Sequence, residues 1–457
     1  MASRYCFGSI MEWFNAVPRS LNGCPERSLI ARRASRPWCG LPAGECAGLQ
    51  PSAGPRRHFS RVRDASSCHA TRRSTPSFRP KVKNSRNGSV SHYRRNSPLR
   101  ATPVLVAFVG LLLVSAQASA ALRLGVVAPK GDQSYAVLGD QFRQGVRAYR
   151  AEHPDAFSDI VEVGETCEDE AGPTIGKQLV DAKVDAVVGF FCPESLNAAL
   201  PILAGAHIPT LTATVRADIV AERPAKENWP FFRLAPSEDM LTRKIADVIE
   251  ARWADEPFAI VEDGTIYGRV LAENVNALLK QNGLTPSFTD TFRPADEKQV
   301  ALANRLERAG VTRVFVGGQR DDVAVIARDC RKIGLDLTFL GGDALRAPKG
   351  DVPLPDGTLA VMMPQPWTLP SAKDALAALK AHGIEPYGEP VPGYAAASVI
   401  AAAEKSDEPL GKALATERFD TALGPIRFGP DHERTDNPFE LMVWRDDAFV
   451  PADDRKP

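Results

Sequence analysis

The stretch LRLGVVAP, residues 122–129, predicts the first buried strand of a folded domain. An amphipathic stretch, GDQFRQGVRAYR at 139–150, follows it, and the same alternation leads to the apolar run AVVGFF at 186–191. Continuous apolar runs that are bounded by turns and separated by helical patterns are typical of a parallel sheet covered on both faces. We interpret Thr210 and Leu211 as the last strand of this series.

A second series of the same kind begins at Phe258. Its apolar runs lie at 258–261, 314–316 and 338–340, and the first two are each followed by a helical pattern. Two consecutive series of similar size predict an α/β protein with two Rossmann-like lobes, each built on a parallel central sheet.

The chain then crosses back. A strand is predicted at 358–363, an Ala-rich helix around 399–404, and closing β segments at 424–428 and 439–445. We predict a first lobe of residues 121–236 and 362–424, a second lobe of 237–361 and 425–452, and a tail of 453–457. Several linkers between two lobes favour a hinge over two independent domains.

A secretory signal peptide is predicted at 99–120. Arg100 supplies its positive charge, residues 103–114 form a short apolar core, and Ala118-Ser119-Ala120 is a small-residue cleavage site. The apolar run is short for a membrane span, and no stop-transfer segment follows it. We therefore expect the working protein to begin near Ala121, in the periplasm.

The preceding 98 residues read as a disordered basic leader. Residues 1–100 contain 19 Lys and Arg against 4 Asp and Glu, and the leader shows no hydrophobic period. Three interpretations compete: an organellar transit sequence, a twin-arginine export signal around Arg94 and Arg95, and a misassigned start with translation beginning near Leu99. We favour the last.

The composition of the remaining chain excludes several classes of function. Residues 101–457 contain 37 Lys and Arg against 52 Asp and Glu, which argues against a nucleic-acid partner. Four histidines follow the signal, and none belongs to a metalloprotease or nucleophile-elbow motif. The first strand is not followed by the glycine pattern of dinucleotide enzymes. We expect no enzyme activity, no cofactor and no metal.

Three of the eight cysteines lie after the signal. Cys167 follows one predicted strand and Cys192 follows the next, so adjacent parallel strands would bring the two thiols close enough for a disulfide; the alternative is a pair of free thiols. Cys330 lies on the apolar side of a predicted helix at 323–333, where a buried thiol acts as a small hydrophobic side chain.

Ligands of open parallel sheets bind beyond the carboxyl ends of the strands. The corresponding turns here follow Phe191, Leu211, Val261, Val316 and Leu340. We expect them to face a cleft between the lobes.

The order of several short motifs resembles one family. The cysteine pair around a VVG strand, IPTLTAT at 208–214, DGTIYG at 263–268, Gly317-Gly318 and Gly341-Gly342-Asp343 follow one another in that order. This order is similar to that of the periplasmic leucine/isoleucine/valine-binding proteins, the type I solute-binding components of ABC importers. The resemblance extends over nearly all of residues 122–448 and implies the type I periplasmic binding protein fold.

The resemblance also implies roles for individual residues. The segment after Cys192, with Ser195, and the pair Ala213 and Thr214 would bind the α-carboxylate of a ligand and part of its ammonium group. Tyr267 would close over the ligand from the second lobe, and Asp343 would pair with the ammonium group where relatives commonly have Glu. Gln319 stands where a relative presents an aromatic side chain. The first loop bordering the pocket contains Tyr135, with Leu138 as an alternative.

Other interpretations of these residues stay open. Ser195 is explained equally well as a helix cap, Tyr267 as an ordinary loop aromatic, and Asp343 as a turn former. Arg216 and Arg320 neighbour the implied site and are interpreted as solvated surface charges.

The resemblance implies a monomeric, extracytoplasmic solute-binding protein without enzyme activity. It would bind a small amino acid of the branched-chain type, or a related amide, and deliver it to an inner-membrane ABC permease. The alternative is a ligand sensor of the same fold that signals to a partner protein.

Overall fold

The computed structural model describes residues 121–131, 133 and 135–452. The leader, the signal peptide and the tail predicted above lie outside the described residues. None of the described helices is long and apolar enough to cross a membrane.

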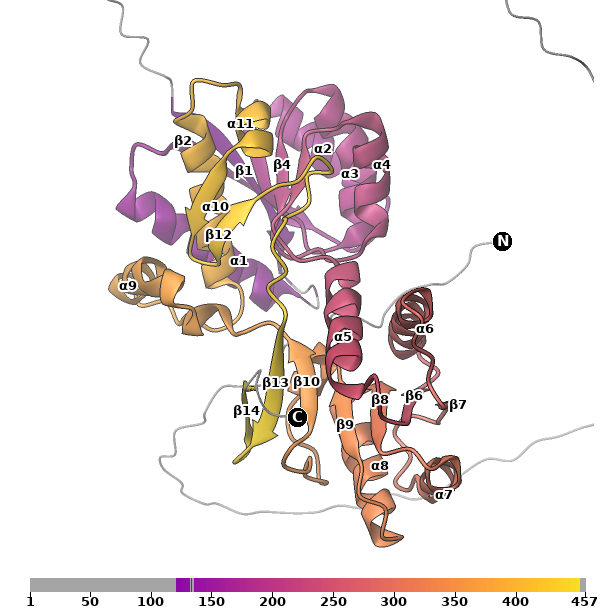
Figure 1. Ribbon diagram of the computed structural model, residues 1–457. Coiled ribbons are helices and arrows are strands. Elements are labelled where there is room, and N and C mark those ends of the chain that lie inside the picture. The colour runs from indigo at the N-terminus through magenta and orange to yellow at the C-terminus, as the bar shows by residue number, and fades with distance from the viewer. Residues whose placement is uncertain (1–120, 132, 134, 453–457) are drawn as a thin grey trace, which may run out of the picture. The chain divides into compact units, whose positions relative to one another are not determined.

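The first lobe is built on a five-stranded parallel sheet in the order β2-β1-β3-β4-β5 (Figure 1). Its strands are β1 Leu122–Pro129, β2 Phe157–Glu165, β3 Ala186–Gly189, β4 Thr210–Thr212 and β5 Phe231–Arg233. Side chains of β1 point alternately to two separate cores, with Val126 in one and Val127 in the other. Burial on both faces explains why these strands read as continuous apolar runs.

Helices cover both faces of this sheet. One core contains side chains of α1 Ala136–Glu152, α9 Lys373–Ala381, α10 Pro390–Glu404 and α11 Leu410–Thr416. The opposite core contains side chains of α2 Ala171–Asp181, α3 Pro193–Gly205 and α4 Ile219–Glu227.

Glycine allows α1 and α10 to pack closely. A Cβ atom on Gly145 would lie 1.9 Å from the carbonyl oxygen of Pro390, and a Cβ atom on Gly393 would lie 2.2 Å from that of Phe142. Because α10 comes more than 200 residues after the first helix, this contact returns the late part of the chain to the first lobe.

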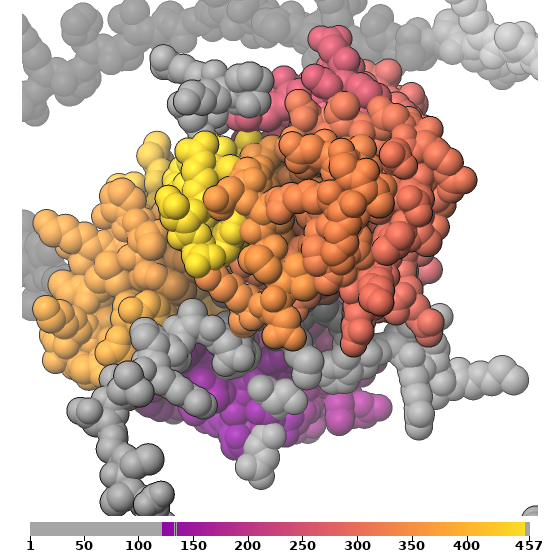
Figure 2. All heavy atoms as spheres, turned by 90° about the horizontal axis from the view of Figure 1, so that it is seen from below, coloured from indigo at the N-terminus to yellow at the C-terminus, as the bar shows by residue number. Residues whose placement is uncertain are grey.

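The second lobe has a seven-stranded sheet in the order β14-β13-β10-β9-β8-β6-β7. Its parallel strands are β6 Phe258–Glu262, β7 Phe288–Thr291, β8 Arg313–Gly317, β9 Thr338–Gly341 and β10 Leu359–Met362. Strand β13 Glu440–Arg445 pairs antiparallel with β10 and with β14 Ala448–Pro451. Figure 2 shows this last part of the chain, in yellow, against the orange segments of the same lobe.

Four α-helices and a short 3-10 turn, η2 Asp343–Arg346, belong to this lobe. The helices are α5 Glu238–Trp253, α6 Ile266–Gln281, α7 Val300–Ala309 and α8 Arg320–Lys332. Helices α5 and α6 pack on one face of the sheet, and α7 and α8 pack on the other.

The predicted two-lobed α/β architecture is confirmed, with two corrections. The first sheet does not end at Leu211, because β5 adds a further strand after α4. The second sheet is mixed rather than parallel, because β13 and β14 arrive from the last crossing and pair antiparallel. The segment at 439–445 was predicted as β structure, but its antiparallel pairing with β10, about 80 residues earlier, is a distant contact that a local apolar pattern does not reveal.

The last crossing comes later than residue 425. Strand β12 Gly424–Arg427 forms a hairpin with β11 Arg418–Thr421, and both Ile426 and Phe428 pack in the core of the first lobe. The chain therefore crosses three times, near 234–237, 363–372 and 428–439.

Candidate functional site

A cavity of about 490 Å³ is lined by both lobes and by all three crossings. In the first lobe, the cavity borders the carboxyl ends of β3 and β4. In the second lobe, it borders the start of α6 and the turn that follows β9. The carboxyl ends of parallel strands meet there, as expected for a ligand site in this kind of sheet. The first lobe contributes Leu138, Phe191, Pro193 and residues 213–218, and the second contributes Leu241, Ile266, Tyr267, Val270, Leu271, Asn274, Asp343 and Ala344.

An ion pair joins the lobes inside this cavity. Arg216 Nη1 donates to Asp343 Oδ2 at 2.5 Å, and the hydroxyl of Tyr267 donates to Asp343 Oδ1 at 3.0 Å. The side chains of Arg216 and Asp343 are only 22% and 15% exposed. Burial by itself lowers the pKa of the Arg216 guanidinium. The charge and hydrogen bond of the neighbouring Asp343 carboxylate outweigh this effect, so the pKa is raised above its ordinary value.

The interpretation of two arginines as surface charges is wrong. Arg216 is mostly buried and paired, and its guanidinium also lies 5.1 Å from the ring centroid of Phe439. Arg320 is 4% exposed, donates to the carbonyl oxygens of Leu345 and Ala347, and stacks on Trp444 at 4.3 Å. Burial lowers its pKa.

Four of the seven predicted ligand residues line the cavity: Ala213, Thr214, Tyr267 and Asp343. The other three, Ser195, Gln319 and Tyr135, are not among the residues that line it. Gln319 precedes α8, and Tyr135 is buried beside the first loop, whose neighbour Leu138 does face the cavity.

Ser195 is fully buried and bonds to a carboxylate of the protein itself. Glu165 Oε2 accepts from the backbone N–H of Phe191 at 2.8 Å, and its Oε1 accepts from that of Cys192 at 3.2 Å and from the Ser195 hydroxyl. Burial raises the pKa of Glu165 to about 7, although these three hydrogen bonds oppose the shift. Sequence reasoning missed Glu165; its only signal was an acid at the carboxyl end of a buried strand.

The predicted disulfide between Cys167 and Cys192 is present. The strands before the two cysteines are not adjacent, however, because β1 lies between β2 and β3 in the sheet. The bond therefore passes over the end of β1 and fixes Cys192, the residue that precedes α3. Cys330 is fully buried, as predicted, and burial raises the pKa of its thiol to about 12.

Arg233, at the end of β5, holds the cavity loop in place. It is 2% exposed, and its Nη1 donates to the carbonyl oxygens of Arg216 at 2.7 Å and Ala217 at 2.8 Å. Its remaining donors reach Asp218 at 2.9 Å and, from the last crossing, Glu433 at 2.6 Å. Sequence reasoning missed this residue because it missed the strand.

Glu389 is a carboxyl group of the cavity without a hydrogen bond or ion pair among the described residues. It lies at the start of α10 and lines the cavity near Leu138, Leu369 and Pro392. Burial raises its pKa to about 7.

Replacing Glu389 by Gln should stabilise the protein at alkaline pH. Between pH 4.5 and 7 the unfolded carboxyl group ionises while the folded one keeps its proton, so stability falls as pH rises and the penalty is complete above pH 7. Allowing for partial exposure, we expect Glu389→Gln to exceed the wild type by about 1–3 kcal/mol at pH 8 and to equal it below pH 4.5. Urea unfolding at both pH values measures this, and equal stabilities at pH 8 would contradict it.

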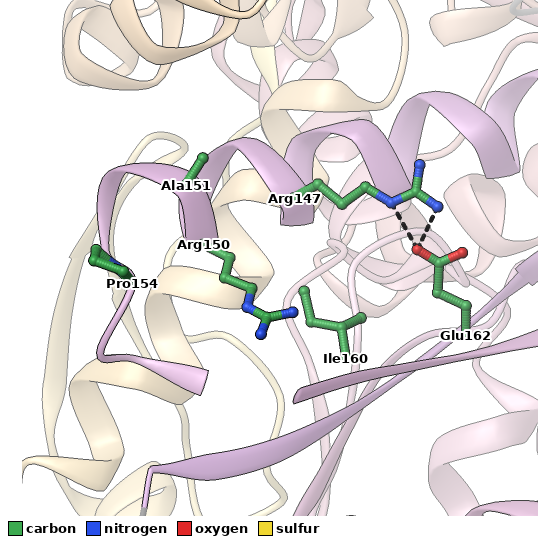
Figure 3. A pocket seen from close by; sticks show the side chains of 6 residues that line it. All are labelled: Arg147, Arg150, Ala151, Pro154, Ile160 and Glu162. Carbon is green, nitrogen blue, oxygen red and sulfur yellow. Dashed lines mark hydrogen bonds and ion pairs between the residues drawn. The ribbon is translucent and has the colours of Figure 1, made fainter. Parts of the chain in front are cut away.

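A second hollow, of about 500 Å³, lies on the first lobe between α1 and β2 (Figure 3). Its main charged groups already pair with each other, since Arg147 Nε donates to Glu162 Oε1 at 2.8 Å. It contains none of the predicted ligand residues. The cavity with Arg216 and Asp343 is therefore the better candidate site.

Comparison with known proteins shows what the chain resembles. The family described as periplasmic binding protein matches residues 170–448. A leucine-, isoleucine-, valine-, threonine- and alanine-binding protein from Pseudomonas aeruginosa is 26% identical over 295 residues, which are 62% of this chain and 78% of that protein.

Solved structures have the same fold. A Rhodospirillum rubrum protein assigned to branched-chain amino acid ABC transport is 21% identical, with a TM-score of 0.63, over 73% of this chain and 100% of its own. A solute-binding protein of an ABC transporter from Rhodopseudomonas palustris, in complex with p-hydroxybenzoic acid, is 17% identical, with a TM-score of 0.53, over 72% of this chain and 95% of its own. The predicted type I periplasmic binding protein fold is confirmed.

Proposed function

The chain belongs to the periplasmic binding protein family, and on that basis we propose that it binds a small amino acid of the branched-chain type, or a related amide, for an ABC importer. The family binds solutes and is not enzymatic. The ligand would occupy the cavity with Arg216 and Asp343 and would be delivered to an inner-membrane permease. The signal peptide predicted before Ala121 supports a periplasmic location, and we expect a monomer.

One observation supports this ligand class above others: a cation and an anion meet beside an apolar wall. Arg216 and Asp343 face each other across the lobes, while Leu241, Ile266 and Leu271 line the same cavity. An amino acid with an aliphatic side chain has a carboxylate, an ammonium group and an apolar part, so it matches all three.

Binding would shift the equilibrium between open and closed lobes. Because the cavity walls come from both lobes, a ligand that contacts both stabilises the closed state. The three crossings, which also line the cavity, are the segments that would bend.

Calorimetric titration of the purified full chain with leucine, isoleucine, valine, alanine, their amides and p-hydroxybenzoate tests the proposal. We expect leucine or a close relative to bind with a dissociation constant in the micromolar range or tighter, about −8 kcal/mol. Asp343→Asn should weaken that binding by about 10- to 100-fold, since it removes a charged acceptor. The exposed Asp336→Asn is the matched control and should leave the affinity unchanged.

Two outcomes would contradict the amino-acid assignment. One is a folded protein that binds nothing in the panel. The other is a preference for p-hydroxybenzoate, the ligand of the Rhodopseudomonas palustris protein, over every amino acid. Capture of a permease by the ligand-bound protein would separate transport from the alternative role of a sensor.

A further inference from the structure

We propose that Arg216, rather than the start of α3, receives the carboxylate of the ligand and thereby makes the protein select acids over the corresponding amides. The inference rests on the proposed function, and it moves the anion subsite away from the position implied by the resemblance. Five features of the site support it.

The start of α3 has already been filled by a carboxylate. The Glu165 carboxylate accepts hydrogen bonds from the backbone N–H groups of Phe191 and Cys192 and from the Ser195 hydroxyl, and the residue is 1% exposed. The next residue, Pro193, has no N–H to donate. A ligand carboxylate at this helix end would find these three donors occupied and would meet a second acid.

The turn after β4 offers few further donors. The hydroxyl of Thr214 donates to the carbonyl oxygen of Phe190. The backbone N–H of Val215 donates to Thr212 Oγ1 at 3.2 Å, and that of Thr214 lies 3.5 Å from the same oxygen. These groups are better placed to shape the turn than to bind an anion.

Arg216, by contrast, has donors to spare. Its Nη1 bonds to Asp343, but its Nε is buried without a partner, and its Nη2 makes no hydrogen bond among the described residues. The unpaired Nη2 is not among the buried atoms and is therefore open to an incoming oxygen, whereas the Nε is enclosed by the protein. The planar guanidinium matches the two oxygens of a carboxylate.

The guanidinium is also held in place before any ligand arrives. The carbonyl oxygen of Arg216 accepts from Arg233 Nη1 at 2.7 Å and from the backbone N–H of Glu238 at 3.3 Å. The ring of Phe439 lies beside the guanidinium. Little ordering is therefore needed on binding.

Asp343 makes the site favour a zwitterion. A carboxylate bound to Arg216 would share its guanidinium with Asp343, and Arg346, which also lines the cavity, offsets only part of the resulting repulsion between the two anions. An ammonium group on the ligand balances this charge by pairing with Asp343, whereas an acid without a cation leaves the repulsion in place.

Leucine and leucinamide test the inference, because they differ only in the carboxylate. Calorimetry with the full chain should show leucine binding at least about 30-fold tighter than leucinamide to the wild type. Arg216→Gln should weaken the binding of leucine by about 100-fold and that of leucinamide by less than about 3-fold. Arg216→Lys keeps the charge but loses the planar guanidinium, so its affinity for leucine should lie between those of the wild type and Arg216→Gln.

Arg147→Gln is the matched control, since Arg147 lies in the hollow of Figure 3 outside the cavity. It should leave both affinities unchanged. Urea midpoints of all variants establish that they fold.

The outcomes separate the two proposals. Suppose that leucine binds the wild type, and that Arg216→Gln weakens the binding of leucine and leucinamide by the same factor or leaves both affinities unchanged. Arg216 then does not receive the carboxylate, and the proposed function stands. If neither compound binds the folded wild type, the amino-acid assignment fails and this inference fails with it.

Discussion

Replacing Arg233 by Met should lower the free energy of unfolding by about 3–5 kcal/mol, the largest effect that we expect from a single substitution. The side chain is 2% exposed and donates four hydrogen bonds, two to the carbonyl oxygens of residues 216 and 217 and two to the carboxylates of Asp218 and Glu433. Met matches the length of the aliphatic part of the Arg233 side chain. It leaves the carboxylate of Glu433, which is 15% exposed, without its partner.

Urea denaturation of the purified protein measures this loss. Arg243→Met is the matched control, because Arg243 is 61% exposed and pairs with Asp239 one turn away. Such a surface pair is worth about 0.3–0.5 kcal/mol. Equal losses for the two variants would show that burial of Arg233 is not what stabilises the loop. Since Arg233 holds the backbone of Arg216, its replacement should also weaken ligand binding.

Reduction of the disulfide between Cys167 and Cys192 should cost about 2–4 kcal/mol, the second large effect. The bond closes a loop with a sequence separation of 25 and joins the ends of β2 and β3 across β1. In the reduced chain this loop is free, so the unfolded state gains conformational entropy.

The double variant Cys167→Ala/Cys192→Ala provides the control. Its urea midpoint should lie below that of the oxidised wild type and should not respond to dithiothreitol. Cys330 and the five cysteines before residue 121 stay in both proteins, so they do not account for a difference. A wild-type midpoint that is the same with and without reductant would contradict the prediction, provided that mass spectrometry shows the bond to be broken.

The disulfide and Glu165 together underlie our proposal that the ligand carboxylate does not bind at the start of α3. The disulfide fixes Cys192, and Glu165, two residues before Cys167, then reaches the N–H groups of residues 191 and 192. The same segment that supplies the first cysteine thus supplies the internal carboxylate.

Local pattern was sufficient for the elements that lie in strongly apolar runs. Strands β1, β3, β6, β8 and β9 were found because burial on both faces forces consecutive apolar residues. Strand β5, FFR, was missed because it has three residues and ends in an arginine. Its partners β4 and Glu433, rather than its own composition, make it a strand and bury its charge.

The amino-acid sequence by itself determined the two α/β series, the cysteine pair, and the strand ends that contribute Thr214, Tyr267 and Asp343 to one cavity. The two series, the cysteine positions and the strand ends follow from periodicity and spacing, which act over a few neighbouring residues, whereas the choice of Thr214, Tyr267 and Asp343 came from the family resemblance. Only the tertiary structure decided which charges are buried: Arg216 pairs with Asp343 across 127 residues, and Arg233 pairs with Glu433 across 200. The physical reason is that a charged side chain is either solvated or buried according to the partner that the fold brings to it, and that partner leaves no mark on the local sequence.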